Sequence, residues 1–147
     1  MRTAGGRKHA PRDEGAAAVE FALVSVLLFT VLFGILQYGF LFFQMQAASS
    51  TARQVARLAS VGISDCANFG TAARTVAAEN EVPSDGFSVT ADFDNGSGTA
   101  ARPEWVDVSV HFSPTDFGAP FVPFPGDMTR TARARVESLG AVVGGCT

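Results

Sequence analysis

The sequence predicts a membrane-anchored α+β protein, in which a long N-terminal helix leads into a small head with a roughly three-stranded antiparallel sheet. The first observation is an apolar run over residues 16–43, which is longer than the roughly 20 residues that a spanning helix needs. The second is that residues 44–60 contain no proline or glycine and are rich in helix-forming residues. The third is that apolar and polar residues alternate along three later segments, as they do in half-buried strands.

Length and charge limit the classes of function. The 147 residues have room for one anchor and one small domain, and the net charge of −3 gives no reason to propose nucleic acid as a partner. Basic residues precede the apolar run, which by the positive-inside rule keeps the N-terminus in the cytoplasm. They are Arg2, Arg7, Lys8 and Arg12. We therefore expect a single-pass protein of the cytoplasmic membrane, in contact with the lipid bilayer, whose C-terminal head is extracytoplasmic.

This topology divides the chain into four segments. Residues 1–15 are predicted to be a cytoplasmic leader, residues 16–43 the transmembrane helix, residues 44–62 its extracytoplasmic continuation and residues 63–147 the exported head. The helix as a whole would be about 70 Å long at 1.5 Å per residue.

A ridge of small side chains runs along the second half of the predicted helix. Ala48, Ala52 and Ala56 are spaced four residues apart and therefore lie on one face. Small residues let helices approach closely, so the ridge suits packing against a neighbouring helix. It suits packing against the protein's own sheet equally well, and the two uses are compatible.

The head is predicted to contain a short helix over residues 71–80 and three strands. The apolar positions of the strands are Phe87, Val89, Ala91 and Phe93, then Val106, Val108, Val110 and Phe112, and, within residues 129–137, Ala132, Ala134 and Val136. A three-stranded sheet is marginally stable alone, so we expect a helix to cover its apolar face. The loop over residues 114–126 is rich in proline and phenylalanine, and is either an exposed hydrophobic contact surface or a lid over the sheet.

The two cysteines, Cys66 and Cys146, both follow the apolar run and so lie outside the cytoplasm on the predicted topology. An oxidising compartment permits a disulfide, and two cysteines allow one intramolecular pairing. That bond would tie the end of the long helix to the C-terminal tail and contribute about 4 kcal/mol in the chain-entropy model. Two free thiols and an intermolecular bridge are the alternatives.

Glu20 is the one charged residue between Glu14 and Arg53. A carboxylate at the edge of the hydrocarbon region is costly, and such a residue usually faces a partner or marks a function. It follows Gly15 by five positions, and the basic N-terminal segment precedes both residues. The alternative is that Glu20 is a helix-start carboxylate at the membrane surface, stabilised by the helix dipole.

Residues 15–62 resemble the TadE-like family of pseudopilins and minor pilins, part of the tight-adherence, or Flp-type, pilus machinery. The matching features are the leader ending at Gly15, the block Ala16 to Phe21 (AAAVEF), the long apolar helix, Gln37-Tyr38-Gly39 and residues 52–59 (ARQVARLA). The pattern Gly-x-x-x-x-Glu is common by chance, but it is much more specific at the start of an uncharged spanning helix. The head carries no motif of the family.

The resemblance implies how the chain is processed and assembled. A prepilin peptidase would cut between Gly15 and Ala16, and the block containing Glu20 and Phe21 would then serve in assembly. The Glu20 carboxylate would pair with the new N-terminal amine of a neighbouring subunit, which selects the register more than it adds stability. The implied partners are the peptidase and other pilins or pseudopilins of the Tad machinery. The implied architecture is pilin-like, and the protein would either stay in the membrane or be incorporated in a pilus. The alternative function is an uncleaved single-pass anchor that presents an extracytoplasmic binding or adhesion domain.

Residues for catalysis or metal binding do not form a recognisable pattern in the sequence. His9 lies in the predicted leader, and His111 stands alone on the polar face of a predicted strand. Cys66 and Cys146 lack the spacing of metal ligands. We therefore expect no enzyme activity, no metal, no cofactor and no small-molecule substrate.

Overall fold

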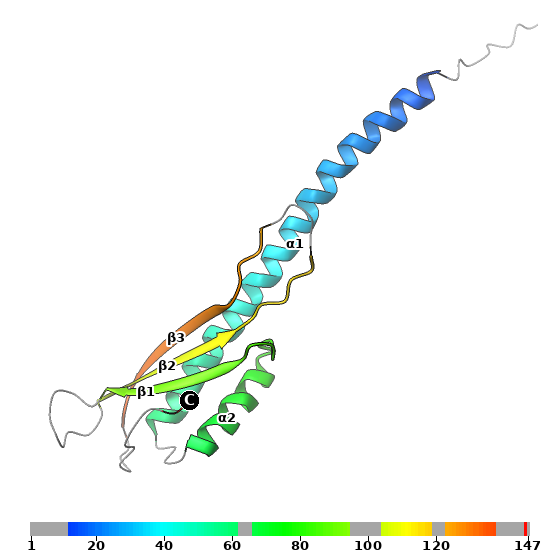
Figure 1. The fold of residues 1–147 in the computed structure, drawn as a ribbon. Coiled ribbons are helices and arrows are strands. Elements are labelled where there is room, and N and C mark those ends of the chain that lie inside the picture. Colours follow the sequence, from blue (N-terminus) through cyan, green and yellow to red (C-terminus); the bar gives the residue numbers. More distant parts are fainter. Residues whose placement is uncertain (1–11, 62–65, 95–103, 119–122, 138–145, 147) are drawn as a thin grey trace, which may run out of the picture.

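A computed structural model defines residues 12–61, 66–94, 104–118, 123–137 and Cys146. Its elements in chain order are helix α1 (Arg12–Ser60), helix α2 (Cys66–Glu79) and strands β1 (Ser88–Asp94), β2 (Trp105–Phe112) and β3 (Met128–Arg135). Figure 1 shows α1 projecting far beyond a small head built from its second half, α2 and the sheet. This arrangement confirms the predicted fold class.

Helix α1 has 49 residues and is about 73 Å long at 1.5 Å per residue. It begins at Arg12, before the predicted start at residue 16. It ends at Ser60, where the backbone N–H of Glu137 donates to the Ser60 carbonyl at 3.0 Å. The chain after β3 thus satisfies one of the carbonyls left free at the helix end.

Helix α2 begins at Cys66, before the predicted start at residue 71. Gly70 has a low helix propensity, but Phe69 beside it is buried in the core, and this packing outweighs the cost of the glycine. The helix ends beside α1, where the Asn80 side chain donates to the Thr51 hydroxyl at 3.1 Å. Glu81 follows in a left-handed conformation with a φ of 58°, which closes the helix end.

The sheet is an antiparallel meander in the order β1-β2-β3. Val108 in the central strand lies opposite Ala91 of β1 and Ala132 of β3, so these three residues share one face. The neighbouring row on the other face is polar and consists of Asp92, Asp107 and Arg133. One buried and one solvated face are typical of a small antiparallel sheet.

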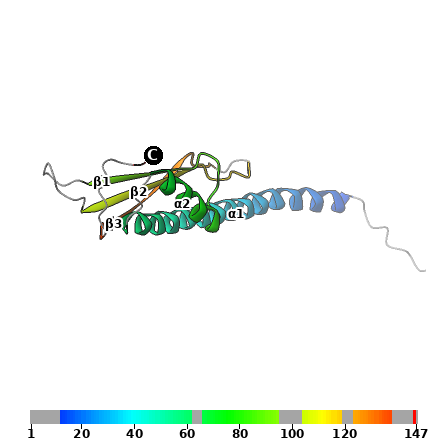
Figure 2. The ribbon, with the colours of Figure 1, turned by 90° about the horizontal axis from the view of Figure 1, so that it is seen from below.

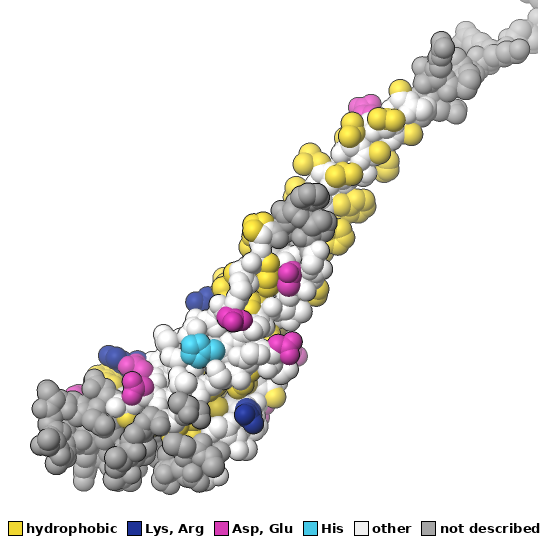
Figure 3. Space-filling view, in the orientation of Figure 1, with side chains coloured by type: hydrophobic (Ala, Val, Ile, Leu, Met, Phe, Trp, Pro, Cys, Tyr) yellow, Lys and Arg dark blue, Asp and Glu magenta, His cyan; other side chains and the backbone are white. Residues whose placement is uncertain are grey.

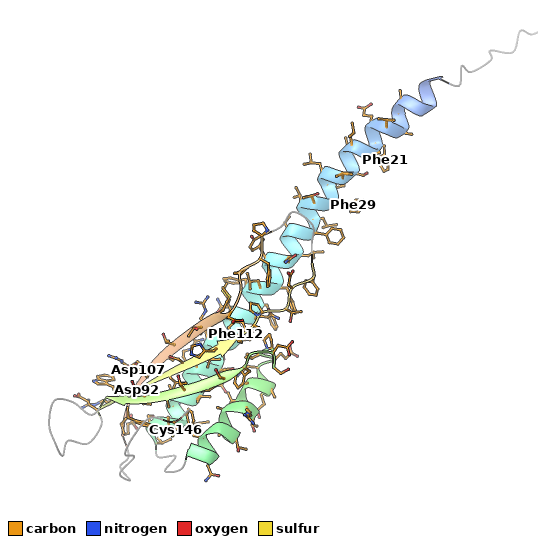
Figure 4. The ribbon with its side chains drawn as sticks, viewed as in Figure 1. Phe21, Phe29, Asp92, Asp107, Phe112 and Cys146 are labelled. Carbon is orange, nitrogen blue, oxygen red and sulfur yellow. The ribbon has the colours of Figure 1, made fainter. Side chains whose placement is uncertain are left out.

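The core lies between the sheet and the two helices, which cover the same face of the sheet in Figure 2. Residues Val106, Val108, Val110 and Phe112 of β2 are all buried, and Figure 4 marks Phe112 at the end of β2 that is nearest the projecting part of α1. The alternation predicted for all three strands is confirmed. On β3 the inward positions are only half-buried, because β3 is an edge strand and its inward alanines are small.

Between β2 and β3 the chain leaves the sheet and runs along α1 before it returns, as Figure 1 shows. The described residues of this segment are 113–118 and 123–127, and we call them the strap. The strap contacts α1 and does not cover the sheet, so of the two predicted arrangements the lid is absent among the described residues. The predicted turn after Asp94 lies outside the described residues.

Candidate functional site

The projecting part of α1, residues 15–36, is the largest uncovered apolar surface of the described chain. Every residue in it is exposed except Ser25, Thr30 and Gly34, which are half-buried. The exposed side chains point in all directions around the helix, among them Phe21 and Phe29 in Figure 4. A window of 18 residues within Gly15–Ser60 has a mean hydropathy of 2.5, and none of it is buried within the molecule. By length and composition this helix is able to cross a membrane.

Polar side chains in this part of α1 are satisfied within the helix, with one exception. The Ser25 hydroxyl donates to the Ala22 carbonyl at 2.9 Å, and the Thr30 hydroxyl donates to the Val26 carbonyl at 2.8 Å. Glu20 is exposed, and no described residue forms a hydrogen bond or ion pair with its carboxylate. Figure 3 shows the apolar side chains that cover the visible face of this projecting segment. A carboxylate at the edge of a hydrocarbon region usually faces a partner or marks a function.

Gly15 lies in the first turns of α1, next to the exposed Ala16. A Cβ atom added at Gly15 would meet no atom within 4 Å. Packing therefore gives no reason for glycine at this position, and alanine would favour the helix by about 1 kcal/mol. A glycine that the fold does not require is compatible with a role in recognition by another protein.

The ridge of Ala48, Ala52 and Ala56 is buried in the core of the head. The second of its two predicted uses, packing against the protein's own sheet, is therefore present in the structure. Since the sheet occupies this surface, contact of the ridge with a second helix stays a prediction.

The strap binds α1 through two glutamines that the sequence analysis did not select. Gln37 is buried and donates to Asp116 Oδ1 at 2.7 Å. Gln44 is buried as well, and it both donates to the Thr115 hydroxyl at 3.1 Å and accepts from the Thr115 backbone N–H at 3.2 Å. The two glutamines are seven residues apart and so lie on the same helix face as the alanine ridge. That spacing, in an otherwise apolar helix, is the signal that would have revealed them.

Aromatic side chains complete the contact between the strap and α1. The Tyr38 hydroxyl donates to the Pro123 carbonyl at 2.8 Å. The Phe40 ring lies against the Phe117 ring, with centroids 5.0 Å apart. Phe117 is nevertheless 61% exposed, so the strap presents an aromatic side chain outward at the base of the head.

The tail returns to the sheet at Cys146. The backbone groups of Cys146 and Ala91 exchange two hydrogen bonds, of 2.8 and 2.9 Å, which extend the sheet by one bridge beside β1. Cys146 is disulfide-bonded, and its position near β1 and α2 is marked in Figure 4. The side chain of Cys66 lies outside what the structure describes, so the pairing of Cys66 with Cys146 stays a prediction.

Charged side chains gather at the end of the head that is farthest from the projecting helix. A hollow of about 370 Å³ there is lined by four arginines, Arg53, Arg57, Arg133 and Arg135, together with Glu137 and small residues. The Arg133 side chain also lies on the outer face of the sheet, where it donates to both carboxylate oxygens of Asp107 at 2.7 and 2.5 Å. This hydrogen bonding holds the pKa of Asp107 below its ordinary value.

Groups of acidic, histidine or cysteine side chains that could hold a metal ion are absent from the described part of the chain. His111 lies on the polar face of β2, where its Nδ1 forms a hydrogen bond of 2.8 Å with the Thr129 hydroxyl. Thr129 is exposed and His111 is half-buried, and the bond links neighbouring strands.

Similarity to known proteins is found in helix α1. The family model described as TadE-like protein matches residues 15–57, from the glycine before Ala16 to the second arginine of the hollow. No curated protein matches the chain, and neither does any solved structure. The family match confirms the resemblance predicted from the sequence. Residues 15–57 of this chain are therefore similar to the TadE-like family, which suggests a protein associated with a Tad-type pilus.

Proposed function

We propose that this protein is a minor pilin or pseudopilin, a structural and non-catalytic component in the assembly of Tad-type (Flp) pili. The observation that carries the proposal is that the TadE-like match starts at Gly15 and covers the projecting helix, whose single carboxylate has no partner in the described chain. A soluble domain would bury such an apolar surface, whereas a subunit that is stored in a membrane and later packed against other subunits keeps it free.

Processing by a prepilin peptidase would remove residues 1–15 and expose the amine of Ala16. The bond between Gly15 and Ala16 lies near the N-terminal end of α1, where the first turn lacks part of its hydrogen bonds and frays readily. Glycine further weakens the helix at this point. The local structure therefore supports opening of this turn in a protease site on the cytoplasmic side of the membrane.

Glu20 would then pair with the Ala16 amine of a neighbouring subunit. In a medium of low dielectric constant, an unpaired carboxylate is strongly unfavourable, so the pair selects one axial position of the new subunit against its neighbours. Phe21, which is 73% exposed, would pack beside this pair against neighbouring helices. Other pilins or pseudopilins of the Tad machinery would supply those helices.

A Glu20→Gln variant tests this role, because it removes the charge and keeps the shape of the side chain. We expect the variant to insert into the membrane and lose its leader normally, yet to cross-link to other pilins at least about tenfold less, since breaking a buried ion pair costs about 3–5 kcal/mol. The measurement is the amount of cross-linked product per processed chain in cells that express the complete machinery.

A Ser25→Ala variant is the matched control. It also removes a polar group from the projecting helix, but its hydroxyl bonds only to the helix itself. The control should cross-link like the wild type. Equal cross-linking of the Glu20→Gln variant and the wild type would refute the assembly role of Glu20.

A further inference from the structure

The head meets α1 at a sharply defined level. Gln37 is the first buried residue along the part of α1 whose side chains the structure describes, and none of residues 15–36 is buried by the described part of the head. At 1.5 Å per residue this uncovered segment is about 32 Å long, which equals the thickness of the hydrocarbon core of a bilayer, about 30 Å. The contacts of the strap with α1 therefore start at the level along the helix where a hydrocarbon core of ordinary thickness would end.

The exposed polar residues and the irregular backbone of the strap make its insertion into the hydrocarbon core unfavourable. Asp116 and Thr115 are exposed, and the strap backbone is neither helix nor closed sheet. Irregular backbone that faces lipid would leave N–H and carbonyl groups without partners, at several kcal/mol each. We therefore expect Gln37 and Gln44, with their partners Asp116 and Thr115, to lie outside the hydrocarbon core.

The surface at this level is nevertheless apolar and aromatic. Exposed fractions are 46% for Tyr38, 37% for Phe40, 59% for Phe42, 48% for Phe43 and 61% for Phe117. The headgroup layer is about 5–8 Å deep on each side of the hydrocarbon, which corresponds to about three to five residues of α1 beyond residue 36. Tyr38 and Phe40 lie within this layer, and Phe42 and Phe43 lie just outside it. Side chains with an aromatic body and a polar tip, such as Tyr38 with its bond to the strap, favour that layer.

We propose that the strap rests on the outer surface of the lipid bilayer, with Phe117 inserted in the interfacial layer beside the aromatic side chains of α1. Contact of the strap with the bilayer surface would then end the membrane-spanning part of α1 at about residue 36, rather than at residue 43 as the sequence predicts. Residues 113–127 include Asp116 and Asp127 but no lysine or arginine. The attachment is therefore apolar and does not need anionic lipids.

Tryptophan fluorescence in vesicles tests this placement, because the chain has a single tryptophan, Trp105. Trp105 begins β2, whereas the strap follows the other end of that strand, about 23 Å away at 3.3 Å per residue. The full-length chain is reconstituted in phosphatidylcholine vesicles that carry bromine either near the headgroup or near the end of the acyl chain. Two variants are made in a Trp105→Phe background, Phe117→Trp on the strap and Phe29→Trp in the middle of the uncovered helix.

We expect the tryptophan of the Phe117→Trp variant to lose fluorescence to shallow bromines and less to deep ones. The Phe29→Trp variant should show the reverse order, and native Trp105 should respond to neither. These losses should be the same when phosphatidylglycerol replaces part of the lipid and when salt is raised. Both substituted side chains are exposed, so the variants retain the packing of the head.

Three results would overturn the proposal. Loss of Phe117→Trp fluorescence to aqueous iodide alone would show that the strap stands in water. Resistance to iodide and to both bromines would show that a second protein chain covers it. A requirement for phosphatidylglycerol would show that charge rather than apolar contact holds the strap. The test depends only on α1 as a membrane anchor and not on cleavage or pilus assembly, so its failure is distinguishable from failure of the proposed function.

Discussion

Replacing Gly86 with alanine should destabilise the head by about 2–3 kcal/mol, because two independent costs meet at this residue. Gly86 has a φ of 62°, a left-handed conformation that costs an alanine about 1–2 kcal/mol. The added Cβ would also overlap the hydroxyl of Ser113, the first residue of the strap. That hydroxyl donates to Asp127 Oδ1 at 2.7 Å and joins the two ends of the strap. Turning it away would cost about 1 kcal/mol more.

The chain offers a matched control for the backbone cost. Gly118 has a φ of 64°, but a Cβ atom there would meet no atom within 4 Å. Gly118→Ala should therefore cost only about 1–2 kcal/mol. In a Ser113→Ala background, where the hydroxyl is missing, Gly86→Ala should cost no more than Gly118→Ala does. The expected coupling of about 1 kcal/mol exceeds the scatter of about 0.3–0.5 kcal/mol between independent sites.

The assay is urea unfolding of the full-length chain in detergent micelles, followed by the fluorescence of Trp105, the only tryptophan. Each variant is compared with the wild type by its midpoint and slope, since a change of midpoint at constant slope reports stability. The reasoning is refuted if Gly86→Ala and Gly118→Ala cost the same. It is also refuted if Ser113→Ala leaves the extra cost of Gly86→Ala unchanged.

The remaining stability predictions use the same unfolding assay. The hydrogen bond from Arg133 lowers the pKa of Asp107, so Asp107→Asn should lower the free energy of unfolding by about 0.5 kcal/mol at neutral pH. This difference from the wild type should disappear as the pH falls below the ordinary value of 3.8 and through the lowered pKa, because Asp107 then becomes protonated in the folded state too. If Cys66 pairs with Cys146, replacing either or both with serine should lower stability by the same amount, up to about 4 kcal/mol, and an additive double variant would contradict the pairing. Gln44→Leu should cost about 1–3 kcal/mol, because it removes two hydrogen bonds to Thr115. Gln37→Leu should cost less, because it also removes a buried Oε1 that has no partner among the described residues.

The elements that were predicted correctly are those whose residues follow a long apolar run or a clear period. The long apolar run specified α1, and the alternation of Val106, Val108 and Val110 specified β2 and its buried face. The start of α2 was predicted too late, because Gly70 opposes a helix locally while the burial of Phe69 favours it. Packing against α1 decides this boundary, and local propensity does not contain that information.

The strap could not be placed from the sequence, because a loop rich in proline and phenylalanine has no period that relates it to a distant surface. Its contacts join residues more than seventy positions apart, such as Gln44 and Thr115. Gly15 and Glu20 were found from a motif. In the structure a Cβ atom at position 15 would contact nothing, and the Glu20 side chain is exposed, so packing within the described chain does not explain either residue. The roles proposed for them involve other molecules, which the structure of a single chain does not contain.

Cleavage after Gly15 is the claim on which the proposed function depends most directly, and the intact mass of the protein extracted from its native membrane tests it. The account predicts a chain that begins at Ala16, and a Gly15→Ala variant that folds normally but keeps residues 1–15, because a Cβ atom fits at position 15 without contact. A wild-type chain that still begins at Met1 in cells with an active prepilin peptidase would contradict the account.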